Sequence, residues 1–175
     1  MRKIIFTKLI ILLGLLVACN EETTNYFPKT PLKSQKQEEG MLVNGKKQGE
    51  WRWFYPDGKL KEVSNWNNDL AEGEAVTYYS NGNKQAIANW QEGRLNGRFR
   101  LFDSITEIVI EELTYADDTL HGPVNTYYNH GATEMTGAFE KGKKHGEYTY
   151  FDANQKPIRK EVWFLGQIKE FNALD

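Results

Sequence analysis

The side chains in this 175-residue chain that could carry catalytic or metal chemistry are few and scattered. Its three histidines, His121, His130 and His145, fall in separate glycine-containing turns and not at the close spacing of a metal-ligand set. Two of them, His121 and His145, directly precede a recurring glycine. The same position elsewhere in the chain holds Gln48, Glu72 and Asn96. A position that accepts such different polar side chains indicates a turn, so we predict no metal site.

Motifs for nucleophilic or phosphate chemistry are also missing from the sequence. No serine lies in a Gly-x-Ser-x-Gly context, and residues 142–144 (Gly-Lys-Lys) lack the arch and following helix of a phosphate-binding loop. The 24 acidic and 22 basic residues give a net charge of −2, which offers no basic surplus for nucleic acid. We therefore predict a non-catalytic protein with no cofactor and no nucleic-acid partner.

One residue, Cys19, is predicted to carry a covalent modification, and it is the only cysteine in the chain. It follows a basic segment (1–8) and an apolar run (9–16) that falls short of the roughly 20 residues needed to span a bilayer. Residues 16–19, Leu-Val-Ala-Cys, resemble the lipobox of bacterial lipoprotein signal peptides. The resemblance implies that residues 1–18 are removed and that acyl chains on Cys19, palmitate among them, attach the protein to a membrane.

The residues around the cleavage point also bear on location. Loss of residues 1–18 removes three basic residues and no acidic ones, so the net charge falls from −2 to about −5, which disfavours electrostatic attachment to anionic lipid. Asn20 stands where an aspartate would resemble an inner-membrane retention signal, so we predict the outer membrane rather than the inner. The pair Glu21-Glu22 resembles a surface-export signal, and the choice between a periplasmic and a surface-facing side stays open. Residues 19–40 are polar and interrupted by Pro28 and Pro31, which predicts a flexible tether.

The rest of the chain is organised by a repeat. Five units begin at glycines that stand 24, 24, 25 and 24 residues apart: Gly49, Gly73, Gly97, Gly122 and Gly146. Five residues after each glycine comes an aromatic residue: Phe54, Tyr78, Phe102, Tyr127 and Phe151. A second aromatic follows 17 or 18 residues after each glycine, and in three units a turn ending in Asp-Gly, Asn-Gly or His-Gly lies between the two. This agreement over five units predicts a repeat architecture.

Each unit has the pattern of two strands joined by a tight turn. In the first strand, alternate residues such as Trp51 and Trp53 are apolar while Glu50 and Arg52 between them are charged, which is the period of a half-buried strand. One hairpin cannot bury its own face, so neighbouring units must stack. We therefore predict an all-β fold over residues 41–175, built as an array of about five 24-residue β-hairpin repeats. The array forms an elongated, single-layer or lightly rolled antiparallel sheet of about ten strands.

Two stretches of this repeat resemble a known family. Residues 44–51 (Asn-Gly-Lys-Lys-Gln-Gly-Glu-Trp) followed by 54–60 (Phe-Tyr-Pro-Asp-Gly-Lys-Leu) look like the bacterial variant of the MORN repeat (membrane occupation and recognition nexus). Residues 140–148 form a second clear copy, and the resemblance extends over about residues 44–171. The family implies elongated hairpin arrays that act as interaction modules, in some members with lipid contact, and some bacterial relatives carry an antitoxin label.

Two segments depart from the regular pattern. In unit three the turn at residues 103–106 has no glycine, and residues 107–113 after it are the most β-prone stretch of the chain. This stretch is either a pairing edge for a partner or a central strand whose glutamates are solvated, and we favour the central strand. Residues 166–171 begin a sixth unit, which we interpret as a cap over an otherwise open sheet edge.

The aromatic residues give the leading functional hypothesis. The five at the first offset, Phe54, Tyr78, Phe102, Tyr127 and Phe151, fall on the face opposite Trp51 and are either structural or a recognition stripe. We hypothesise an envelope lipoprotein whose repeat sheet docks a protein partner. The alternative is a binder of envelope glycan or lipid through the same stripe, and an immunity or antitoxin role ranks third.

Overall fold

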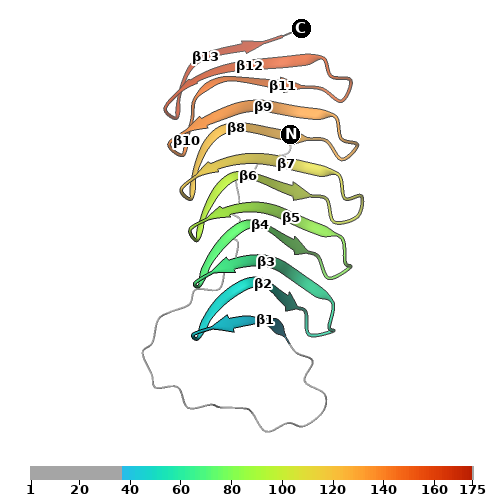
Figure 1. The fold of residues 1–175 in the computed structure, drawn as a ribbon. Helices are drawn as coiled ribbons and strands as arrows, with labels where there is room; N and C mark the ends of the chain where they lie inside the picture. Colours follow the sequence, from blue (N-terminus) through green and yellow to red (C-terminus); the bar gives the residue numbers. More distant parts are fainter. Residues whose placement is uncertain (1–36, 175) are drawn as a thin grey trace. The chain divides into compact units, whose positions relative to one another are not determined.

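The computed structural model describes residues 37–174, which form thirteen β-strands joined by turns and contain no helix. In Figure 1 the strands follow one another in sequence order from blue to red. The strands are β1 (Glu38–Val43), β2 (Lys46–Phe54), β3 (Leu60–Asn67), β4 (Leu70–Tyr78), β5 (Lys84–Gln91), β6 (Arg94–Phe102), β7 (Val109–Ala116), β8 (Thr119–Tyr127), β9 (Thr133–Glu140), β10 (Lys143–Lys144), β11 (Gly146–Phe151), β12 (Pro157–Phe164) and β13 (Gln167–Ala173).

These strands form a single antiparallel sheet in which each strand pairs with its neighbours in the chain, with β10 and β11 both pairing with β9. The predicted all-β array of hairpin repeats is therefore confirmed. Within the described residues there is no helix long and apolar enough to cross a membrane. The predicted signal peptide, Cys19 and the tether up to residue 36 lie outside the part of the chain that the structure describes.

The sheet has more strands than the ten expected, and the additions lie mainly at its ends. β1 begins at Glu38, inside the segment interpreted as tether, because Met41, Leu42 and Val43 favour a strand and Asn44-Gly45 form a tight turn in which both φ angles are positive. At the other end β13 extends the sheet by one strand. β10 is a short strand that His145 separates from β11.

Each hairpin carries a register shift at the same place, just before the aromatic residue five positions after the repeat glycine. A second shift recurs in most of the pairings between units, as between Val63 and Asn65. Bulges of this kind bend and twist a strand. Figure 1 shows the result, since every long strand arches across the sheet.

The curvature gives the sheet two different faces. The inner face is defined by a row of side chains that meet across neighbouring strands: Trp51, Ser64, Ala75, Ala88, Phe99, Leu113, Val124, Gly137, Tyr148 and Glu161. Most members of this row are buried, and Tyr148 is completely buried. Because residues 37–174 form a single layer, these side chains are covered by the flanking side chains of their own curved sheet. The core of the fold is therefore the inner face.

The outer face carries a second continuous row, displaced by one residue along each strand: Arg52, Val63, Val76, Ile87, Arg100, Glu112, Asn125, Thr136, Thr149 and Lys160. In this row only Ile87 is buried. Charged and polar side chains predominate on this side of the sheet, which is the pattern expected of a solvated face.

The two irregular segments differ in part from their predictions. β7 pairs with β6 on one side and β8 on the other, so the central-strand interpretation of unit three is confirmed. Its glutamates are not all solvated, because Glu111 lies on the inner face, where burial raises its pKa. The predicted cap is wrong, because β13 is itself the last strand and, within the described residues, pairs only with β12.

Candidate partner-binding surface on the outer face

The first unit fills its inner face with a cluster of rings around one cation. Lys47 Nζ lies 4.4, 4.6 and 4.9 Å from the ring centroids of Trp51, Trp53 and Trp66. Glu38 of the edge strand β1 adds a carboxylate, whose Oε2 accepts a 3.0 Å hydrogen bond from Trp53 Nε1 and lies 3.8 Å from Lys47 Nζ. The cluster is thus occupied by a cation of the chain itself.

The last unit repeats this arrangement at the same offsets from its glycine. Lys144 Nζ lies 4.4 Å from the Tyr148 ring centroid and 4.6 Å from that of Trp163. The buried Glu161 accepts hydrogen bonds of 2.9 Å from both Tyr150 Oη and Trp163 Nε1. Burial lowers the pKa of Lys144, and Glu161 opposes that shift. The side chains of Lys47 and Glu38 at one end of the inner face, and of Lys144 and Glu161 at the other, therefore have partners in the same sheet.

The strand register places the five aromatic residues that the sequence selected on the outer face. Each stands two residues after a member of the outer row and next to the register shift of its hairpin. Phe54, Tyr78, Tyr127 and Phe151 are half-buried, whereas Phe102 is 8% exposed and buried. We call these five residues the outer aromatic row. Neighbouring members are two strands apart, about 10 Å along the sheet.

A second set of aromatic side chains holds the outer aromatic row in position, and the sequence interpretation missed it. The Tyr55 hydroxyl donates a 2.6 Å hydrogen bond to the Tyr78 carbonyl oxygen of the next unit. Tyr79 donates likewise to the Phe102 carbonyl at 3.0 Å, and Tyr128 to the Phe151 carbonyl at 2.7 Å. The signal in the sequence was the aromatic doublet in each of these units: Phe54-Tyr55, Tyr78-Tyr79 and Tyr127-Tyr128.

In unit three the doublet is broken, because Asp103 follows Phe102. Asp103 Oδ1 instead accepts hydrogen bonds from the backbone of Ile105 at 3.0 Å and Thr106 at 2.9 Å, which lowers its pKa. Its turn therefore closes on itself, and no tyrosine hydroxyl at this position links unit three to unit four.

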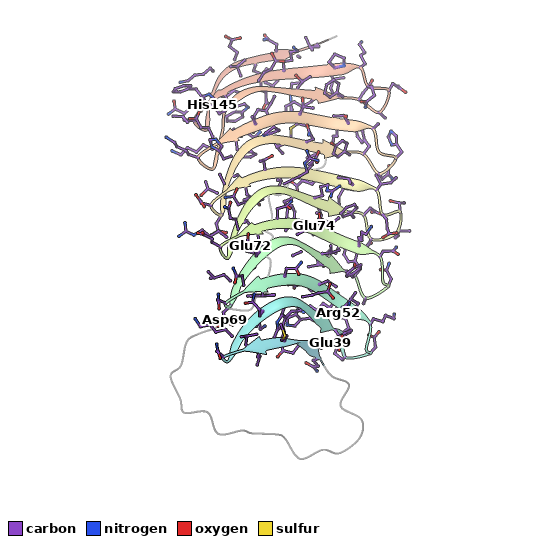
Figure 2. The ribbon with its side chains drawn as sticks, in the orientation of Figure 1. Glu39, Arg52, Asp69, Glu72, Glu74 and His145 are labelled. Atoms are coloured by element: carbon purple, nitrogen blue, oxygen red, sulfur yellow. The ribbon has the colours of Figure 1, made fainter. Side chains whose placement is uncertain are left out.

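Charged side chains surround the outer aromatic row. Arg98 Nε lies 3.1 Å from Glu112 Oε1, and Tyr127 Oη lies 3.3 Å from Glu112 Oε2. Near the β1 end, Arg52 Nη2 lies 2.6 Å from Glu50 Oε1, and Arg52 Nη1 lies 3.7 Å from Glu39 Oε1. Figure 2 labels Arg52 and Glu39 in this region of the sheet. The outer face therefore combines half-exposed rings with charges of both signs.

His121 and His145 lie at the margin of the sheet where successive units are joined, whereas His130 lies in the turn between β8 and β9. Figure 2 shows His145, Asp69 and Glu72 along the joining side. Glu72 Oε2 accepts a 3.0 Å hydrogen bond from Glu92 N, and His121 Nδ1 accepts one of 3.5 Å from Lys141 N. Gln48 Oε1 likewise accepts a 3.1 Å hydrogen bond from Asn68 N. The prediction that this position is a turn is wrong for these three residues, which lie within β2, β4 and β8. Their side chains instead accept hydrogen bonds from the backbone of a neighbouring turn.

The remaining two histidines have other surroundings. His145 Nε2 lies 3.4 Å from Glu140 Oε2, and its ring packs against Phe164 with the centroids 5.3 Å apart. His130 stacks on Tyr128 at 5.5 Å. Among residues 37–174, no three or more His, Cys, Asp or Glu side chains form a group that could hold a metal ion.

Comparison with known proteins bears on the first two units. No curated protein matches the chain significantly. The family model described as MORN repeat variant matches residues 47–68 and 71–92, in the register of β2–β3 and β4–β5. The match confirms the resemblance for the first two units, and the resemblance over the rest of residues 44–171, the copy at residues 140–148 included, stays a prediction. Two stretches of the chain match the MORN repeat variant, which suggests a repeat-based binding or scaffold module, and proteins of that repeat family are generally non-enzymatic.

Proposed function

We propose that this chain is a non-catalytic, lipid-anchored protein of the bacterial cell envelope that docks a protein partner on the outer face of its sheet. The observation that carries the proposal is the outer aromatic row, with four half-buried rings at one repeat offset on the face opposite the core. Aromatic side chains dominate the energetic centres of protein interfaces, where they are ringed by polar contacts.

The contrast between the two faces supports the choice of the outer one. Inner-face polar groups such as Lys47 and Glu161 are already engaged by rings and hydrogen bonds of the same sheet. The outer aromatic row, by comparison, has its backbone fixed at three of five positions by tyrosine hydroxyls. A rigid row loses little conformational entropy when a partner binds, which favours affinity.

The membrane part of the proposal rests on the sequence resemblance at residues 16–19 and on Cys19. We expect Cys19→Ala to abolish both palmitate labelling and recovery in the membrane fraction, because the acyl chains have no other thiol to occupy. The matched control is Ser34→Ala, which leaves the cysteine in place. Retention of label and of membrane association by the Cys19 variant would exclude lipid anchoring.

The partner itself is tested by cross-linking the acylated protein in cells and identifying what is captured with it. We expect one dominant protein at near-equal amounts, and at least a tenfold lower recovery with the double variant Phe54→Ala/Tyr127→Ala. The control is Asn65→Ala/Glu74→Ala, which removes two exposed outer-face side chains without touching the row. Unfolding of the aromatic variant would show that the row is core, and recovery of glycan or lipid alone would assign the row to the alternative function.

A further inference from the structure

The last strand of the sheet, β13, presents an open edge. All seven of its residues, Gln167–Ala173, are exposed, and within the described residues it pairs only with β12. Its large apolar side chains are largely uncovered, with Phe171 59% and Ile168 48% exposed. Natural sheet edges are blunted by proline, by charged side chains, by bulges or by a covering segment. β13 contains no proline, and its charges and its register shift are confined to one place, Lys169 and Glu170.

The register of β13 shows which groups the open edge offers. Phe171 lies opposite Glu161, and Ile168 lies opposite Trp163, so both apolar side chains extend the inner face. The register shift leaves Lys169 as the extra residue between them. The amide of Leu174 donates a 3.0 Å hydrogen bond back to Ile158 of β12. The N–H groups of successive residues in an antiparallel strand point alternately to its two sides. Since the N–H of Leu174 points toward β12, those of Ala173 and Phe171 point to the open edge.

We propose that this edge pairs with β13 of a second copy of the chain, antiparallel, about a two-fold axis that passes between Lys169 and Glu170. In this register Lys169 of each copy lies opposite Glu170 of the other, and Ile168 lies opposite Phe171. Opposite charges and large apolar side chains are favourable cross-strand pairs. Both pairs form twice, because a two-fold interface uses the same patch on each copy. The inner faces of the two sheets then continue across the junction.

The other end of the sheet lacks this self-complementarity. In β1 the charged residues are Glu38 and Glu39, and the apolar residues Met41, Leu42 and Val43 stand at the opposite end of the strand. Antiparallel self-pairing about its centre places carboxylates opposite apolar side chains and offers no cation. Pairing of β1 with β13 of another copy is head-to-tail and does not close, so it would build open-ended polymers and not a dimer.

The test is a charge exchange in the full-length acylated chain, purified in detergent and carrying either of two affinity tags. Wild-type copies with different tags are expected to be captured together as a dimer. Lys169→Glu and Glu170→Lys, each alone, put like charges opposite each other at both positions and should reduce capture at least tenfold. An equal mixture of the two variants should restore it, because each altered side chain then faces an opposite charge. Co-occupancy of a micelle through acyl chains does not follow this pattern.

A second measurement reports on the strand itself. In the wild-type dimer the amide of Phe171, which faces Ile168 of the other copy, should exchange with deuterium at least tenfold more slowly than in either single variant. The thermal unfolding midpoints of the two single variants should agree with each other, since both altered side chains are exposed and both variants lose the dimer. A wild-type monomer, single variants that dimerise normally, or a mixture that fails to recover would each overturn the proposal. Polymers that lengthen with concentration would replace it with head-to-tail pairing. The dimer and the proposed partner fail independently, because one concerns an edge and the other a face.

Discussion

On the inner face the ring of Tyr148 is completely buried, whereas the rings of Tyr127 and Phe151 on the outer face keep part of their surface in solvent. The sheet in residues 37–174 has only one layer, so this difference cannot come from a covering element. It comes from curvature, because the strands bend at recurring register shifts and close their own side chains around the middle of one face. A single-layer repeat sheet thus obtains a core on one side and leaves the other side available for binding.

The strongest test of the difference between the two faces is to remove one ring from each face and compare the loss of stability. Tyr148→Ala deletes a fully buried ring and its 2.6 Å hydrogen bond to the Ala138 carbonyl, and should lower the free energy of unfolding by about 4 kcal/mol. Tyr127→Ala on the outer face should cost only about 1 kcal/mol. Chemical denaturation of the two variants measures both values. Equal losses would mean that the two faces do not differ as core and surface.

A glycine beneath the inner-face ring gives the next largest effect. An added Cβ at Gly137 would overlap the ring of Tyr148, which has no room to move, so Gly137→Ala should cost about 2 kcal/mol. Gly40 stands in the same relation to Trp51, but it belongs to the edge strand β1. Gly40→Ala should therefore release β1 alone, seen as faster amide exchange confined to that strand. Loss of protection throughout the sheet in this variant would contradict the expectation.

A smaller effect is expected from the tyrosine hydroxyls that join units on the outer face. Tyr128→Phe removes a 2.7 Å hydrogen bond to the Phe151 carbonyl and should cost about 1 kcal/mol. Tyr127→Phe is the matched control, because its hydroxyl lies 3.3 Å from the partly exposed Glu112. Thermal unfolding of the two variants measures the difference. A Tyr127 variant that loses as much as the Tyr128 variant would show that the hydroxyls do not serve as unit-to-unit links.

The fold was predictable because each strand pairs with its neighbours in the chain. The glycines, the turn residues and the alternation of apolar and charged residues were enough to assign hairpins and their order. The curvature was not predictable, since it depends on an extra residue between two paired strands, such as Lys61 opposite the step from Trp53 to Phe54. Such a register shift is a property of two paired strands, and it cannot be read from the alternation of apolar and polar residues in either strand alone.

The candidate site was also predictable only in part from the sequence. The common face of the outer aromatic row followed from its constant offset, but the burial of Phe102 did not. Its unit has the longer turn, in which Asp103 and Ile108 close the loop by a 2.9 Å backbone hydrogen bond. The supporting tyrosines were visible only as doublets, and a doublet does not say which of its two rings donates to the next unit.

The smallest expected effect concerns pH, and it sharpens the description of the inner face. Burial raises the pKa of Glu111, and also that of Glu62, where a hydrogen bond from Ser64 and the nearby Lys61 and Lys47 oppose the shift. A carboxyl whose pKa is higher in the folded state stabilises the fold below its unfolded pKa of about 4.5, and this stabilisation is lost as pH rises through the folded pKa. Relative to Glu111→Gln, the wild-type protein should therefore lose stability as pH rises from about 4.5 toward neutrality. Glu62→Gln should reveal a weaker dependence, because its carboxylate has partners. Unfolding free energies at a series of pH values test both. Equal pH dependence of the wild type and Glu111→Gln would place Glu111 in solvent, and a difference of the opposite sign would mean that a partner stabilises its carboxylate.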